Sequence, residues 1–241
     1  MKKYFAPAIA VFLVLLIAVS TAGCAARINP KGAAIKYLND KYDDTFTYYQ
    51  TYGGKSFLES EKPLKIVCTS EKYPDMYVTA QYSLDRKTIQ DNYISVKYSQ
   101  QLDKKVSEIL TSAFPQKEYY FTSFAEDTIN ASFRDFAPDT SFEEYLAKSG
   151  ETFSVCLNYT NGEINLEQIQ NDLERQIVEA GAYFFHITVY VFEDCEDFGL
   201  NYENAISLLN HGIHAHILTA RMEDNTGFTE ATWNDSSEFH F

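Results

Sequence analysis

Histidines are concentrated in one short segment near the C-terminus. Three of the 5 histidines lie close together, at His211, His214 and His216. On a β-strand, His214 and His216 would project from the same face, at a spacing that lets two imidazoles bind one metal ion. A zinc site needs three or four protein ligands, so His186 or Cys156 would have to join them. We predict a solvated sheet face here, with no bound metal or other cofactor; the alternative is a metal-binding or sensing protein.

A thiol nucleophile is the second chemistry to weigh. Besides Cys24, the chain contains Cys68, Cys156 and Cys195, and a thiol-dependent hydrolase would need a base such as His186 beside Cys156. Buried structural thiols are the simpler interpretation, since free cysteine packs as a small apolar residue. A disulfide between Cys156 and Cys195 stays open. Because no nucleophile elbow, phosphate loop or metal motif has the required spacing, we predict no catalytic residue.

Tyrosines form a third group of interest. The chain has 18 of them, and Tyr48, Tyr49 and Tyr52 lie in one short run. Strand alternation would place Tyr48 and Tyr52 on one side and Tyr49 on the other. Such a run suggests a peptide- or glycan-binding face, although the β-propensity of tyrosine explains it equally well.

The N-terminus has the pattern of an export signal. Lys2 and Lys3 precede an uncharged apolar run, Ala8–Val19, which is shorter than the ~20 residues that a membrane-spanning helix needs. Small residues follow it, as at a signal peptide cleavage site. We therefore predict that residues 1–23 are a signal peptide.

The residues at this cleavage site resemble a bacterial lipobox. Thr21-Ala22-Gly23-Cys24 has the small residues and the cysteine of that motif, although Thr21 stands where leucine is usual. The resemblance implies cleavage before Cys24 and a diacylglycerol on its sulfur; the alternative is an ordinary signal peptide. Residues 24–32 would be a short tether that reaches at most roughly 30 Å when extended.

Apolar periodicity and turn signals predict alternating helices and strands beyond the tether. The expected helices are Ala33–Tyr42, Leu102–Ala113, Phe142–Ala147, Leu166–Gly181 and Asn201–His211. The expected strands are Phe46–Tyr52, Leu64–Thr69, Tyr77–Tyr82, Ile94–Tyr98, Phe153–Tyr159, Tyr183–Phe192, Ile213–Met222 and Phe228–Trp233. Asn165, followed three residues later by Gln168, is a capping pair and makes the helix after it the best defined.

This order of elements predicts an α+β fold. Pro115 interrupts the chain after a long helix, so we expect an N-terminal α+β unit at 33–115 and a C-terminal α/β sandwich at 116–241. Each unit would be a small mixed α/β structure, with helices packed on one face of a largely antiparallel or mixed sheet.

Three segments of the chain resemble uncharacterised lipoproteins of low-GC Gram-positive bacteria. They are Ala34–Tyr42, Asp91–Tyr93 and Thr140–Leu146. The resemblance implies an export route and a two-part α+β body. It implies no activity, so it assigns no functional residue.

The net charge of the chain excludes nucleic acids as partners. With a formal net charge of −14, the chain would repel nucleic acids, and it has no basic amphipathic segment for anionic membranes. The sequence therefore predicts a lipid-anchored protein on the extracytoplasmic face of the cell membrane. Its role would be non-catalytic: binding a protein or glycan partner, or another function in the envelope.

The lipid anchor gives a direct test. We expect Cys24→Ala to abolish retention in the membrane fraction, because the acidic body has no other affinity for the bilayer. Cell fractionation with an alkaline wash measures this, with the wild-type chain as control. A variant that still sediments with membranes after the wash would show that the lipobox assignment is wrong.

Overall fold

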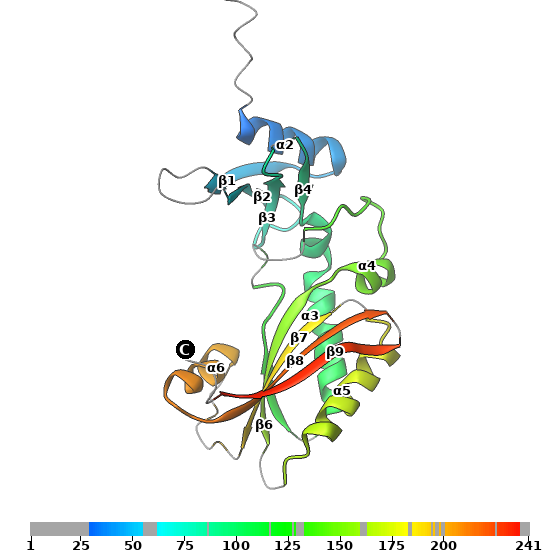
Figure 1. The fold of residues 1–241 in the computed structure, drawn as a ribbon. Helices are drawn as coiled ribbons and strands as arrows, with labels where there is room; N and C mark the ends of the chain where they lie inside the picture. The colour runs from blue at the N-terminus through cyan, green and yellow to red at the C-terminus, as the bar shows by residue number, and fades with distance from the viewer. Residues whose placement is uncertain are drawn as a thin grey trace, which may run out of the picture.

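The computed structural model consists of two β-sheets joined by one long helix, α3 (Tyr93–Ala113) (Figure 1). It describes residues 29–54, 62–85, 87–115, 117–126, 128, 133–159, 163–182, 185–193, 195, 198, 201–224 and 226–236. The predicted signal peptide and Cys24 lie outside the described residues. Among the described helices, none combines the length and the apolar character needed to cross a bilayer.

The first sheet is fully antiparallel and has the order β1-β2-β3-β4. Its strands are β1 (Phe46–Gly54), β2 (Lys62–Ser70), β3 (Tyr77–Tyr82) and β4 (Ile89–Asp91). Helix α2 (Pro30–Lys41) covers one face of it, where the buried Ala34 and Leu38 join Ile66 and Val78 in the core. Strand alternation makes this one-sided burial possible, because every second side chain points to the same face.

Helix α3 starts earlier than predicted. Residues Ile94–Tyr98, expected to be a strand, form its first turns, so that prediction is wrong. Tyr93, Ile94, Ser95 and Val96 are all buried, because this end of the helix is surrounded by other elements. Burial on several sides removes the one-sided 3.6-residue pattern that identifies a surface helix, and the remaining alternation resembles a strand.

The second sheet has the order β5-β6-β7-β8-β9, with one parallel pair, β6 and β7, among antiparallel neighbours. Its strands are β5 (Glu118–Phe121), β6 (Thr152–Tyr159), β7 (His186–Glu193), β8 (Ala215–Asp224) and β9 (Gly227–Asp235). The accompanying helices are α4 (Phe142–Lys148), α5 (Leu166–Glu179) and α6 (Tyr202–Asn210).

Helices lie on both faces of this second sheet. Phe153, Val155 and Leu157 belong to the large core that also contains α3 and α5. Cys156 points to the opposite face, where it packs with Ala205 of α6. The α+β class predicted from the sequence is confirmed, and α6 adds a second layer beyond the expected single helical face.

The predicted cap of α5 is confirmed. The side chain of Asn165 accepts a hydrogen bond from the backbone N–H of Gln168 at 3.0 Å, which satisfies one of the four donors that a helix N-terminus leaves open. Strands β4 and β5 were not predicted, because three or four residues are too few to show a period.

A buried carboxylate links α2 to the start of α3. Asp91, whose side chain is 1% exposed, accepts hydrogen bonds from the hydroxyls of Tyr37 at 2.8 Å and Tyr42 at 2.7 Å. Lys41 Nζ lies 2.9 Å from the same carboxylate, and the backbone N–H of Tyr93 donates to it at 3.0 Å. The charge of Asp91 is thus fully compensated without solvent.

This cluster shifts the acid–base behaviour of its members. Burial, with the negative charge of Asp91, raises the pKa of Tyr37 to about 12 and that of Tyr42 further above its usual value. Burial by itself would lower the pKa of Lys41, but its hydrogen bond and attraction to Asp91 outweigh that effect and raise it. Lys41 and Asp91 are therefore an ion pair at neutral pH.

Helix α3 belongs to both predicted units. Its first residue, Tyr93, stacks on Tyr42 of the first unit with ring centroids 4.1 Å apart, while Leu102 and Val106 lie in the core shared with α5. The division of the chain into two units at Pro115 stays a prediction. Helix α3 packs on elements from both sides of that position.

Two lysines of α2 test the buried pair. Replacing Lys41 with alanine should cost about 3 kcal/mol of unfolding free energy, because it leaves the buried carboxylate of Asp91 without its counter-charge. Lys36→Ala is the matched control: its pair with Asp40 is exposed, with Lys36 74% accessible, and should be worth less than about 1 kcal/mol. Urea unfolding followed by circular dichroism measures both, and equal losses would contradict the proposed role of Asp91.

Candidate functional site: the open edge of strand β5

Strand β5 is an edge of the second sheet, and one side of its backbone has no strand partner among the described residues. The N–H of Thr122 donates to the carbonyl of Ser154 at 3.0 Å, so Thr122 faces β6. Because neighbouring residues of an antiparallel strand point their backbone groups to opposite sides, Tyr119 and Phe121 direct their N–H and C=O groups outward. These four groups line the open edge.

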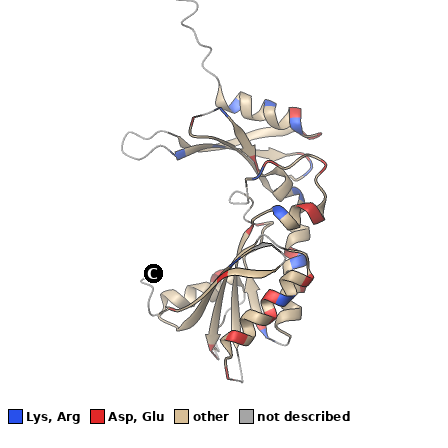
Figure 2. Ribbon diagram, turned by 45° about the vertical axis from the view of Figure 1, so that its right-hand side comes forward, with Lys and Arg blue, Asp and Glu red and all other residues tan. Residues whose placement is uncertain are grey.

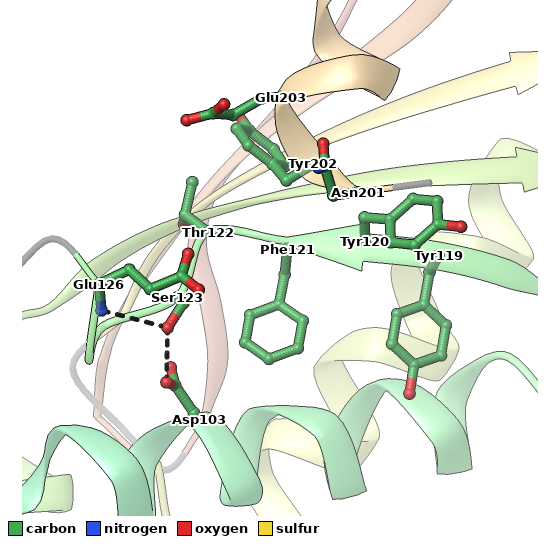
Figure 3. Close-up of a pocket in the computed structure, with 10 residues that line it drawn as sticks. All are labelled: Asp103, Tyr119, Tyr120, Phe121, Thr122, Ser123, Glu126, Asn201, Tyr202 and Glu203. Carbon is green, nitrogen blue, oxygen red and sulfur yellow. Dashed lines mark hydrogen bonds between the residues drawn. The ribbon is translucent and has the colours of Figure 1, made fainter. Parts of the chain in front are cut away.

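A groove of about 810 Å³ follows this edge. Figure 3 shows β5 between α3, which carries Asp103, and the first turn of α6, which carries Tyr202 and Glu203. Phe121 points toward α3. The volume lies within the range of sites that bind ligands of the size of a short peptide.

Tyr119 is fixed to the α3 side of the groove. Its hydroxyl lies 2.6 Å from Thr111 Oγ1 and donates to the carbonyl of Ser107 at 3.2 Å. Both partners belong to α3, so the ring holds the strand at a set distance from the helix.

The opposite side of the groove is formed by aromatic residues near α6. Tyr120 stacks on Phe198 with ring centroids 5.5 Å apart. Asn201 caps α6 by accepting a hydrogen bond from the N–H of Asn204 at 2.9 Å, which places Tyr202 in the first turn. Burial raises the pKa of Tyr202 to about 12, so its hydroxyl stays neutral.

Asp103 closes one end of the groove by holding the loop after β5. It accepts hydrogen bonds from Ser123 Oγ at 2.7 Å and from the backbone N–H groups of Phe124 at 2.7 Å and Ala125 at 3.3 Å. The bond to Ser123 is drawn in Figure 3. One carboxylate thus fixes the direction in which the chain leaves the strand.

The structure brings together only some of the residues of the metal site considered as the alternative. The rings of His214 and His216 lie 5.1 Å apart, and His214 Nε2 is 2.7 Å from Asp235 Oδ1. Along the β7–β8 pair, His216 lies opposite Val191, whereas His186 lies opposite Arg221, at the other end and on the other face. No described group of three His, Cys, Asp or Glu side chains has the geometry of a metal site.

The structure likewise separates Cys156 from His186. His186 lies opposite Thr152, four residues along β6 from Cys156, which corresponds to about 13 Å. Cys156 is fully buried, and burial raises the pKa of its thiol to about 12. Cys156 therefore lacks both an adjacent base and the thiolate character that a thiol nucleophile needs.

The cysteines that the structure describes form no disulfide. Cys68 and Cys156 are buried, as expected for structural thiols, and Cys195 is half-buried. Asn158 holds the backbone of Cys195 through two hydrogen bonds, donating to its carbonyl at 2.8 Å and accepting from its N–H at 3.0 Å. The prediction of buried structural thiols is confirmed for Cys68 and Cys156.

The tyrosine run on β1 is arranged differently from the prediction. A bulge between Tyr48 and Gln50 shifts the register, so Tyr49 and Tyr52 share the face away from α2 while Tyr48 points toward it. Tyr49, 52% exposed, lies 4.7 Å from the ring of Tyr77. Simple alternation fails here because a bulge adds one residue to a single strand.

Comparisons with known proteins add little to this geometry. No family model matches the chain, and no curated protein matches it. It is similar to the crystal structure of a DUF5037 family protein from Ruminococcus gnavus, with a TM-score of 0.38 and 13% identity over 84% of this chain and 95% of that one.

The role of Asp103 in shaping the groove is testable. Asp103→Ala removes three hydrogen bonds to a carboxylate, and we expect a loss of about 2 kcal/mol of unfolding free energy. Protection of the amide protons of Phe124 and Ala125 should fall at the same time, as measured by hydrogen exchange. Unchanged protection of these two amides would show that Asp103 does not hold the loop.

Proposed function

We propose that the chain is a lipid-anchored, non-catalytic binding protein of the extracytoplasmic membrane face in Gram-positive bacteria, and that its groove along β5 binds an extended peptide. The observation that carries the proposal is the open edge of β5 between two helices. Outward backbone groups at Tyr119 and Phe121 supply the hydrogen bonds that an added strand requires. Of the protein or glycan partner expected from the sequence, this proposal selects a protein segment as the ligand.

An extended peptide fits this groove better than a small metabolite. Backbone hydrogen bonds from an edge strand give affinity without regard to side chains, and pockets on alternate sides give specificity. Here the two sides are different: Phe121 lies toward α3, and Tyr202 lies on the α6 side. Tyrosine gives large contact area at low cost in side-chain entropy, which suits a recognition surface.

The predicted anchor is compatible with this position of the groove. The tether precedes α2, which lies at the end of the molecule remote from the second sheet (Figure 1). A lipid on Cys24 would therefore leave the first sheet nearest the bilayer and β5 farther from it. Partners in the cell envelope would reach the groove without passing between the protein and the membrane.

Selection from a random heptapeptide phage library tests the function. We expect the purified mature chain in detergent micelles to enrich peptides whose affinity depends on the outward N–H of residue 121. Phe121→Pro removes that donor, and proline is tolerated at a position whose N–H faces away from the ladder. Peptides synthesised from the enriched clones should bind this variant about tenfold more weakly than Phe121→Ala, which loses the same ring but keeps the donor.

The two variants distinguish strand addition from other modes of binding. Circular dichroism must show the same folded content in both. Failure of the wild-type chain to enrich any peptide, or equal affinities of the two variants in fluorescence polarisation, would overturn the proposal.

A further inference from the structure

The charges around the β5 groove are of one sign. Asp103, Glu126 and Glu203 line it, and none of the other described lining residues is Lys, Arg or His. Asp103 is occupied by the loop after β5. Glu126 and Glu203 are exposed, and neither forms an ion pair with a described residue.

These two carboxylates lie at the same end of the groove. In Figure 3, Glu203 from α6 and Glu126 from the loop are near Thr122 and Ser123, where β5 ends. The chain as a whole is acidic, with 34 Asp and Glu against 20 Lys and Arg and a formal net charge of −14. Figure 2 shows that charged residues of both signs are carried mainly by helices and loops.

The other end of the groove is aromatic. Tyr119 and Tyr120 lie toward the start of β5, three and two residues before Thr122, which corresponds to roughly 10 Å and 7 Å along a strand. Tyr119 is fixed by its hydroxyl on α3, and its ring remains half-buried. A side chain that packs here would be bulky and apolar or aromatic.

We propose that the groove selects cationic peptide strands, with a Lys or Arg near Glu126 and Glu203 and a bulky apolar residue about three positions away. The inference rests on the proposed function, because it specifies the ligand of that same site. Its physical basis is charge complementarity at one end of the edge strand and aromatic contact at the other. Carboxylates without a partner attract a cationic side chain and repel an anionic one, which gives specificity as well as affinity.

The heptapeptide selection described above also tests this inference. Enriched clones should contain more Lys and Arg and less Asp and Glu than the unselected library, with an aromatic or large aliphatic residue at the stated spacing. Replacing the basic residue of a synthetic enriched peptide with glutamine should weaken binding about fivefold at 50 mM salt, and by clearly less at 500 mM, because salt screens exposed charges.

A pair of double variants provides the matched control. Glu126→Gln with Glu203→Gln should reduce affinity for the basic peptide about fivefold and leave affinity for the glutamine peptide unchanged. Glu163→Gln with Glu167→Gln changes the net charge by the same amount on exposed residues outside the groove, and should leave both affinities unchanged.

The failures of the two proposals are distinguishable. Enriched peptides of neutral composition, or equal loss of affinity in the two double variants, would overturn charge selection while leaving strand addition in place. Absence of enrichment would overturn both.

Discussion

A buried ion pair at Asp91 is the constraint from which much of the architecture follows. A carboxylate that is 1% exposed must find partners inside the protein, and Asp91 finds them in Tyr37, Lys41 and the backbone of Tyr93. These partners belong to α2 and to the first residue of α3. One charge on β4 therefore fixes two helices, and because α3 continues into the core of the second sheet, it also influences where that sheet lies.

Helix α3 also positions the residues of the groove. Its later turns present Ser107 and Thr111 to the ring of Tyr119, and Asp103 to the loop after β5. The edge strand is thus held to α3 at Tyr119 and through the loop that follows it. An edge held in this way can accept a peptide with little rearrangement, which reduces the entropic cost of binding.

The structure does not bring the candidate reactive side chains together into a catalytic or metal-binding arrangement among the described residues. Cys156 is buried under α6, and His186 lies four residues farther along the sheet. His214 is paired with Asp235 at the end of β9, a partner that the sequence did not predict. The open edge of β5, with the aromatic rings and the two exposed carboxylates that line its groove, is the surface on which the proposed function rests.

The sequence by itself determined the α+β class, most of the long strands, and the capped helix α5, because periodicity and caps are local signals. It also led to the predictions of a signal peptide and of lipidation at Cys24, which lie outside the described residues and stay predictions. Only the tertiary structure decided that Ile94–Tyr98 is helical, since burial on several sides erased the periodicity. The groove could not be predicted from the sequence either. Glu118–Phe121 is too short to show a period, and an open strand edge depends on which strands pair.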